Sequence, residues 1–457
     1  MTVSPARPPV TRGQQLEIRV DTLNSHGDGL ARVQGYTVFL PGALPGDAVL
    51  AEIVKTTPRF GVARVVEQRE AGPDRLPPPC PVFPDCGGCR FQNLSYPAQL
   101  AFKQQVVIDS LRHLGKIDLP VPLRAEPAGP LFGYRNKAQF ALSGRGRDLR
   151  IGFFRAGTHE VIDSDVCNTL AGPINAVKEW LRGLIRRHRV SIYDETSHQG
   201  FLRGLVVRHS VATGQTLVGL VTTRGVFKKR FLPELTQAPE LKAFGVVGIL
   251  QNFNPARTNV LLGRKSRPLW GRDYLEDQLG DLKFRVSLNT FFQVNPFETE
   301  KLYATLAEWV RGETGRVVDA FCGNGGISLW LGRAGHRVLG IDESKPAIED
   351  ARVSAEWNGI GTVQFLEGTL EGRLKDLEAQ GPVGTLIVDP PRKGLSAEVV
   401  AAIPKLNPGR LIYVSCNPAT LARDLARLPG YRIQDIRLID LFPQTQHIET
   451  AVLLTPT

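Results

Sequence analysis

"RVVDAFCGNGGISLWLGRAGHRVLGID", residues 316–342, is the stretch of sequence that decides the fold of this chain. Two short runs rich in Val, Leu and Ile flank a glycine-rich turn and a segment with apolar residues at helical spacing. The order predicts a strand, a loop, a helix and a second, parallel strand. Gly323, Gly325 and Gly326 let the backbone of the loop approach a ligand closely before the helix begins.

Strands and helices continue to alternate after this stretch. "VQFLEG", "TLIVDPP" and "RLIYVSC" are further predicted strands, and "YRIQDIRLIDLFPQTQHIETAVLLTP" predicts a closing β-hairpin. We therefore expect a Rossmann-like α/β domain over residues 291–457, with a doubly wound parallel sheet and an antiparallel edge.

The regions before this domain have a different pattern. Residues 1–11 read as a disordered tail, and residues 12–69 contain four or five short alternating runs that predict a small β-barrel. Residues 70–290 predict a mixed, mainly β central domain, with helices near 97–114 and 171–189, and recurrent basic clusters make it the expected RNA-binding region. Small barrels frequently bind single-stranded nucleic acid, although the fold alone does not establish that function.

Basic residues are concentrated outside the C-terminal third. The chain carries 56 Lys and Arg against 45 Asp and Glu, a formal net charge of +11. Residues 315–457 hold 15 basic and 16 acidic side chains, which leaves 41 and 29 for the rest of the chain. The surplus indicates either an ordinary solvated surface or a platform for a polyanion ahead of a near-neutral catalytic domain.

Targeting segments are not evident in the sequence. No apolar run reaches the roughly 18 residues of a membrane span, and "MTVSPARPPVTRG" lacks the apolar stretch of a signal peptide. We therefore expect a cytoplasmic protein without a membrane association, whose thiols stay reduced or bind metal.

Ligands of such sheets bind at the carboxyl ends of the strands. A lone glycine loop is a weak signal, and the G-x-G-x-x-G of dinucleotide enzymes is absent. Asp342 is the first candidate to accept hydrogen bonds from a ribose, and Glu343 is the second. The alternative is that this position is only a solvated, helix-capping acid. The fourth strand ends in Asp389-Pro-Pro. Together these features resemble the S-adenosylmethionine-dependent methyltransferases.

Cys416 follows directly on a predicted strand, in "IYVSCNPATL" (412–421). A thiolate there could add to C6 of a pyrimidine, so that C5 attacks a methyl group and a base then removes the C5 proton. Glu449 suits the base, and His447 suits orientation of its loop. Methylation of an exocyclic amine is disfavoured because Arg392, not an aromatic residue, follows Asp-Pro-Pro. Cys416 as a buried apolar residue, and Cys322 as a rival thiol, remain alternatives.

Five segments together resemble the RNA uracil-5-methyltransferase family: "FFQVN" (291–295), "DAFCGNG" (319–325), "DPPRKG" (389–394), "SCNPATLARDL" (415–425) and "FPQTQHIE" (442–449). The resemblance implies a class I methyltransferase domain with Cys416 as nucleophile and Glu449 as base. It also implies cofactor contacts from Gln293 on a strand-like segment, Phe321, Gly323, Gly326, Asp342 and Asp389. Two positions depart from the family pattern, since Asp342 replaces the usual Glu and Gly326 replaces an Asn of some members.

The predicted central domain contains a cysteine cluster. Cys80, Cys86 and Cys89 form a C-x5-C-x2-C array, and Cys167 is the remaining thiol outside the catalytic domain. Four thiolates suit either a [4Fe–4S] cluster or a zinc site, and spacing alone does not choose between them. The family resemblance implies a [4Fe–4S] cluster held by all four. Radical chemistry is disfavoured because the spacing differs from C-x3-C-x2-C.

The N-terminal barrel resembles the TRAM module, an RNA-binding domain. Barrel and cluster together are typical of members that act on 23S ribosomal RNA, so we expect a monomeric enzyme that forms 5-methyluridine there. Transfer RNA as substrate, a non-catalytic RNA-binding protein, a redox protein and a cytosine-5 methyltransferase remain alternatives. Candidate RNA contacts are Phe132, Tyr134, Arg135 and Lys137.

Overall fold

The computed structural model describes residues 8–457, which divide into two compact units. The first unit contains the described residues through Val106 together with Phe442–Gln446. The second contains Val107–Leu441 and His447–Thr457. Most of the tail predicted for residues 1–11 lies outside the described residues. In the described part of the chain, no helix is both long and apolar enough to span a bilayer.

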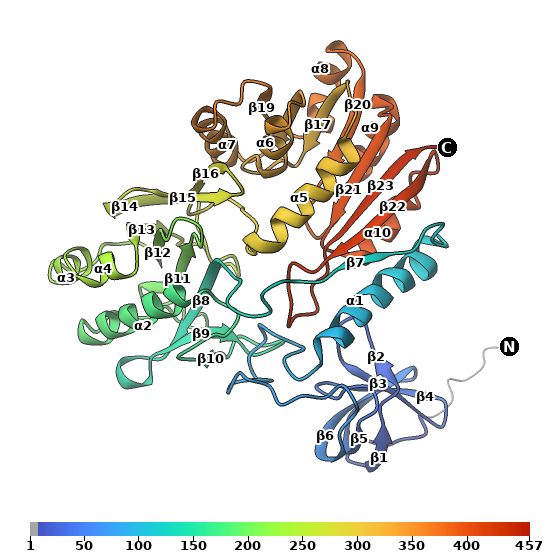
Figure 1. Cartoon of the computed structure of the whole chain (residues 1–457). Coiled ribbons are helices and arrows are strands. Elements are labelled where there is room, and N and C mark those ends of the chain that lie inside the picture. The colour runs from blue at the N-terminus through green and yellow to red at the C-terminus, as the bar shows by residue number, and fades with distance from the viewer. Residues whose placement is uncertain (1–7) are drawn as a thin grey trace. The chain divides into compact units, whose positions relative to one another are not determined.

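The first unit is built on a six-stranded sheet in the order β1-β5-β6-β4-β3-β2 (Figure 1). Inward-facing Val38, Leu40, Ala51 and Ile53 are almost fully buried, because alternate residues of a strand face the same side. The all-β prediction for this region is confirmed. The strands are β1 (Gln15–Arg19), β2 (Thr22–Leu23), β3 (Gly29–Val33), β4 (Tyr36–Leu40), β5 (Ala48–Thr56) and β6 (Phe60–Glu70).

A cysteine-containing loop follows, and then the helix α1 (Tyr96–Ser110), which continues into one π-helical turn, Leu111–Gly115. The second unit starts within α1 and contains two large sheets and one hairpin. The hairpin consists of β15 (Tyr274–Leu279) and β16 (Leu282–Ser287). Asp350 joins it to the rest of the unit, because its carboxylate accepts hydrogen bonds from the Ser287 amide and the Arg285 side chain, both at 2.9 Å.

A seven-stranded sheet in the order β10-β9-β8-β11-β12-β13-β14 forms the central region. Its strands are β8 (Lys137–Ser143), β9 (Arg150–Phe154), β10 (Val161–Asp163), β11 (Leu202–His209), β12 (Thr216–Thr222), β13 (Val246–Phe253) and β14 (Lys265–Gly271). The helix α2 (Gly172–Arg187) covers one face, where its apolar side packs on Ala138, Phe140 and Leu142 of β8. The short helices α3 (Phe231–Thr236) and α4 (Glu240–Ala243) complete this core.

The catalytic sheet has eight strands in the order β19-β18-β17-β20-β21-β23-β22-β7. The first five run parallel, β23 is antiparallel to its neighbours, and the predicted doubly wound sheet with an antiparallel edge is confirmed. The strands are β17 (Arg316–Ala320), β18 (Val338–Asp342), β19 (Val363–Glu367), β20 (Val383–Val388), β21 (Arg410–Ser415), β22 (Tyr431–Ile439), β23 (Thr450–Pro456) and the added edge strand β7 (Arg124–Glu126).

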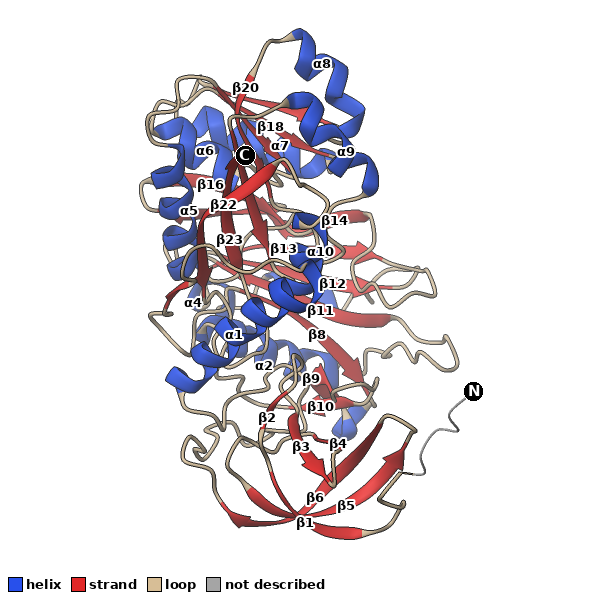
Figure 2. Ribbon diagram, turned by 90° about the vertical axis from the view of Figure 1, so that its right-hand side faces the viewer, coloured by secondary structure: helices blue, strands red, loops and turns tan. Residues whose placement is uncertain are grey.

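Helices cover both faces of this sheet, with α5 and α6 on one side and α9 and α10 on the other (Figure 2). They are α5 (Pro296–Val310), α6 (Gly326–Arg333), α7 (Lys345–Trp357), α8 (Leu374–Ala379), α9 (Ala397–Leu406) and α10 (Pro418–Leu425). Local sequence sets two of their starts. Asn295 and Asn417 cap α5 and α10, each followed by a proline at the first helical position.

One predicted element is wrong. Residues 291–295 were expected to be strand-like, but they form a loop between β16 and α5. The physical reason is local: Asn295 accepts a hydrogen bond from the Glu298 amide and Pro296 opens the helix, so the chain turns into α5 where a strand would need to extend.

Candidate active site

Cys416 lies where β21 ends and α10 begins. Its side chain is half-buried, and the next residue, Asn417, accepts a hydrogen bond from the Ala419 amide at 3.1 Å to start the helix. Burial, with the carboxylates of Glu449 and Asp389, raises the pKa of the Cys416 thiol to about 11 against the opposing effect of Arg392. The thiol is therefore protonated at neutral pH until a base accepts its proton.

Glu449 is the last residue before β23 and is only 3% exposed. Burial raises its pKa well above the ordinary value, nearby Asp389 raises it further, and Arg392 lowers it. Burial together with Asp319 raises the pKa of Asp389 to about 7. The structure thus brings the predicted nucleophile, the predicted base and Asp389 into one electrostatically coupled group. A carboxyl group with a raised pKa can take and return a proton near neutral pH.

The glycine loop holds buried polar atoms that have no partner. Asp319, at the end of β17, accepts a hydrogen bond from Ser328 Oγ at 2.6 Å through one oxygen, while its other oxygen has none. The side-chain nitrogen of Asn324 is likewise buried and unpaired. Because unpaired buried polar atoms are costly, this pair points to a polar ligand at the loop. Burial raises the pKa of Asp319 to about 7.

Three predicted cofactor residues frame the same loop. Phe321 has a φ of +67°, a left-handed conformation that is uncommon for a residue with a Cβ and is often found at functional sites. Asp342 ends β18 and its two oxygens accept from the amides of Gly323 (2.9 Å) and Ser344 (2.8 Å). The carboxylate therefore orders both the loop and the start of α7, and it retains lone pairs for a ribose.

Gly326 stands where a side chain would not fit. A Cβ at this position would collide with the hydroxyl of Tyr303, which projects from α5. Burial raises the pKa of Tyr303, and Asp389, Asp319 and Glu449 add to the rise. Tyr303 therefore lies among the acids of the site. Sequence reasoning missed it, because one Tyr among the apolar residues of a helix carries no signal of its own.

Arg392 and His447 form a polar pair at the edge of the site, with the guanidinium 3.1 Å from His447 Nδ1. The backbone oxygen of Arg392 accepts a hydrogen bond from the Asn417 side chain at 3.0 Å. Asn417 thus joins the Asp-Pro-Pro loop to the loop of Cys416. The role of His447 in orienting its loop stays a prediction.

Gln293 lies in the loop before α5 and is 7% exposed. Its backbone oxygen accepts a hydrogen bond from the Asn136 side chain at 3.2 Å, so the loop is tied to the central region. Its role as a cofactor contact stays a prediction. Cys322, the rival thiol, is 8% exposed, and burial beside Asp319 and Asp342 raises its pKa well above the ordinary value, which makes it a poor nucleophile.

The cluster cysteines fall into both units. Cys80 is buried and Cys86 and Cys89 are half-buried in the first unit, whereas Cys167 belongs to the second. Among residues 8–457, no three His, Cys, Asp or Glu side chains are grouped as they would be around a metal ion. The donor chemistry, four thiols with three on one loop, suits a thiolate-held cluster, and the cluster stays a prediction.

One candidate RNA contact is wrong. Tyr134 is fully buried. Alternate side chains of this segment face the interior, and the Tyr134 ring is one of them, so it cannot contact RNA. Phe132 is 36% exposed, and Arg135 and Lys137 are half-buried, so these three stay candidates.

Comparison with known proteins places these features in context. Residues 258–457 match the family model described as tRNA (Uracil-5-)-methyltransferase, and residues 9–66 match the TRAM domain. An uncharacterized RNA methyltransferase of Halalkalibacterium halodurans is 40% identical and covers 99% of both chains. A second one, of Clostridium acetobutylicum, is 37% identical and covers 98% of both.

A solved structure matches along nearly the whole chain. It is the Pyrococcus abyssi tRNA (uracil-54, C5)-methyltransferase in complex with S-adenosyl-L-homocysteine, with a TM-score of 0.77 and 28% sequence identity. The match covers 96% of this chain and 100% of the other.

Proposed function

The chain belongs to the RNA uracil-5-methyltransferase family, and we propose that it forms 5-methyluridine in 23S ribosomal RNA, with Cys416 as nucleophile and Glu449 as base. One observation carries this proposal: the half-buried thiol at the exit of β21 is electrostatically coupled to buried Glu449 and half-buried Asp389. A thiol and a proton acceptor in one buried site are what addition to a pyrimidine and later elimination require.

The reaction begins at the thiol. Cys416 gives up its proton to the coupled carboxyl pair, and its sulfur forms a bond to C6 of the uracil ring. The electron pair of the C5–C6 double bond moves toward C5 and O4, which makes C5 nucleophilic. Arg392 favours the charged thiolate, because it lowers the pKa of the thiol.

The carboxyl pair then passes the proton taken from Cys416 to water, so that Glu449 is ionised when the cycle is completed. After C5 has gained a methyl group it carries both that group and its original proton. Glu449 removes the proton, the C5–C6 double bond forms again, and the C6–S bond breaks to release the Cys416 thiolate. The raised pKa of Glu449 suits this step because a more basic carboxylate is the better proton acceptor.

S-adenosyl-L-methionine supplies the methyl group when it is bound. The residues present suit it, since the unpaired polar atoms of Asp319 and Asn324 lie at the glycine loop and Asp342 stands at the end of the neighbouring strand. We assign the cofactor contacts to Gln293, Phe321, Gly323, Gly326, Asp342 and Asp389. Asp342 takes the ribose position and the glycine loop orders the site.

The RNA class rests on the N-terminal module and the cysteines. We propose that Cys80, Cys86, Cys89 and Cys167 hold a [4Fe–4S] cluster that organises the protein toward ribosomal RNA, and that the enzyme works in the cytoplasm as a monomer. Transfer RNA is the second candidate. Transfer RNA is favoured by the similarity to a solved structure that is named as a tRNA methyltransferase, because that match covers 96% of this chain.

The test is a trapping experiment. The protein is incubated with S-adenosyl-L-methionine and 5-fluorouridine-substituted RNA, from 23S ribosomal fragments and from transfer RNA in parallel. Fluorine at C5 cannot leave as a proton, so a methylated covalent adduct accumulates, and intact-mass and peptide analysis map it to Cys416. Unsubstituted RNA is the control and forms no lasting adduct. An adduct at another residue, or none with RNA bound, contradicts the mechanism, and the RNA that traps identifies the substrate class.

A further inference from the structure

A large cavity lies on the seven-stranded sheet, on the face opposite α2. Its volume is about 1130 Å³, more than the roughly 300–1,000 Å³ of ordinary small-molecule pockets. Lys137, Gln139, Ala141 and Ser143 of β8 line it together with Leu142, while the alternating Ala138 and Phe140 pack toward α2. Cys416 and the acids of the active site are not part of its lining. The cavity is therefore a separate site from the catalytic one.

Two loops close over this face, and each needs a glycine beneath it. Leu261 lies over Gly204 of β11, where a Cβ would be 2.5 Å from the leucine side chain. Leu288 lies in the same way over Gly219 of β12, at 2.6 Å. These close approaches bring residues 258–262 and 289–291 to the cavity as two of its walls.

Two buried arginines of β11 hold these walls in place. Arg203 donates hydrogen bonds to the backbone oxygens of Asn254 (2.7 Å) and Thr258 (3.0 Å). Arg208 donates to the backbone oxygens of Leu288 and Thr290. Since both guanidinium groups are more than nine-tenths buried and bond to carbonyls, they fix the shape of the cavity.

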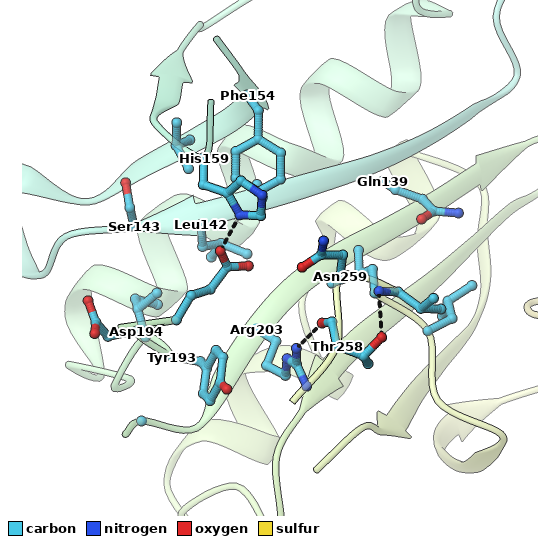
Figure 3. Close-up of a pocket in the computed structure, with 18 of the residues that line it drawn as sticks. Gln139, Leu142, Ser143, Phe154, His159, Tyr193, Asp194, Arg203, Thr258 and Asn259 are labelled. Atoms are coloured by element: carbon cyan, nitrogen blue, oxygen red, sulfur yellow. Dashed lines mark hydrogen bonds and ion pairs between the residues drawn. The ribbon is translucent and has the colours of Figure 1, made fainter. Parts of the chain in front are cut away.

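Aromatic rings stand around the cavity, as Figure 3 shows for three of them. Phe154 is stacked on His159 with ring centroids 5.0 Å apart, and His159 is held by the Glu195 carboxylate. The Arg203 guanidinium stacks on Tyr193, with its central carbon 4.5 Å from the centroid of the tyrosine ring. Phe291 is 62% exposed at the far wall. Exposed, fixed rings of this kind are stacking platforms for nucleobases.

Lys137 supplies an amine at the floor of the cavity. Burial, together with neighbouring Arg208 and Arg135, lowers the pKa of this amine to about 6, so it is mostly neutral at pH 7 in the free protein. The amine thus lies in a positive field, and a phosphate beside it would favour the charged form. The acidic side chains at the rim are already engaged, since Asp194 accepts from Ser197 at 2.8 Å and Glu195 from His159.

We infer that this cavity binds single-stranded RNA that flanks the methylated uridine, with bases stacked on Phe154 and Phe291 and a phosphate held by Lys137. The inference rests on the proposed function for the identity of the RNA. The wall at residues 289–291 leads within two residues to Gln293, so the chain itself connects the cavity to the catalytic domain.

The test compares full-length wild-type protein with Phe154→Ala, Phe154→Trp, Lys137→Ala and the control Trp357→Ala. Trp357 is as exposed as Phe154, 38% against 37%, also contacts one aromatic ring, and is outside the cavity. Binding of a labelled single-stranded RNA of about 12 nucleotides, within the site sizes such grooves take, is measured by fluorescence anisotropy without cofactor. The methylation assay then gives KM and kcat separately.

We expect Phe154→Ala to raise the Kd and KM about 5- to 150-fold with kcat preserved, and Phe154→Trp to restore both. Lys137→Ala should lower the slope of log Kd against log salt concentration by about 0.7, because this is the change expected when one phosphate contact to a single strand is lost. Equal RNA binding by Phe154→Ala and Trp357→Ala would overturn the inference. If wild-type protein makes no 5-methyluridine but Phe154→Ala still weakens RNA binding, the proposed function fails and the cavity inference stands.

Discussion

The two large sheets of the second unit bury opposite charges. The carboxyl edge of the catalytic sheet holds buried Asp319 and Glu449 beside half-buried Asp389, and the pKa values of all three rise. The seven-stranded sheet buries Arg203 and Arg208, whose donors are taken up by backbone carbonyls. Buried arginines satisfied in this way give shape, whereas acids whose pKa values are raised toward or above neutrality hold protons that can move. The arginines of the seven-stranded sheet therefore suit binding, and the acids of the catalytic sheet suit chemistry.

The sharpest test of this contrast removes the proton acceptor. Glu449→Gln should lower turnover about 10²- to 10⁴-fold, because the C5 proton can no longer be removed efficiently. A methylated covalent complex at Cys416 should then accumulate even with ordinary uridine, which intact-mass analysis detects. Glu349→Gln, an exposed acid on α7, is the control and should turn over normally. Free product released at the wild-type rate would remove Glu449 from the mechanism.

The buried acids should also appear in the pH dependence of stability. The pKa of Asp319 is 3.8 in the unfolded chain and about 7 in the folded protein. Protonated Asp319 therefore stabilises the folded state fully below pH 3.8, and this stabilisation is lost as the pH rises toward 7. Asp319→Asn should therefore flatten the fall of the unfolding free energy between these pH values by up to about 1.4 kcal/mol per pH unit. Urea unfolding at several pH values measures the slope. An unchanged slope would mean that Asp319 titrates normally.

On the other sheet, a larger side chain at Gly204 should damage the cavity and spare the catalytic group. Gly204→Val would press on Leu261, which lies in contact range already, and displace the wall at residues 258–262. We expect weaker RNA binding and a destabilisation of about 1–3 kcal/mol from overpacking. Reactivity of Cys416 toward iodoacetamide, followed by peptide mass analysis, should stay at the wild-type level. A change in that reactivity would show that the two regions are coupled.

The smallest effect concerns a helix cap. Asn417→Ala should cost about 1 kcal/mol of stability, and Ser396→Ala, the matched cap of α9, should cost the same. Only Asn417→Ala should also change the alkylation rate of Cys416, because Asn417, unlike Ser396, donates a hydrogen bond to the backbone oxygen of Arg392. Equal alkylation rates in the two variants would limit Asn417 to a capping role.

Sequence patterns predicted the elements whose signal is local. The strands, the helix starts and the placement of Cys416 at a strand exit follow from apolar spacing, prolines and capping residues within a few positions. The features that were missed depend on distant partners. The edge strand Arg124–Glu126 is three residues long and is defined by its pairing with β22, and Tyr303 joins the acids only through packing of α5. No local pattern carries that information.

The division of the chain has a consequence for the order in which the protein matures. Gln99 and Gln444 exchange hydrogen bonds of 3.1 and 2.9 Å inside the first unit, across 345 positions of sequence. A ribosome releases the N-terminal residues long before it makes Phe442–Gln446. The first unit therefore cannot be completed until residues 442–446 have been made, and its buried Gln99 lacks Gln444 until then. Completion of the first unit is thus tied to the segment that directly precedes Glu449, the proposed base.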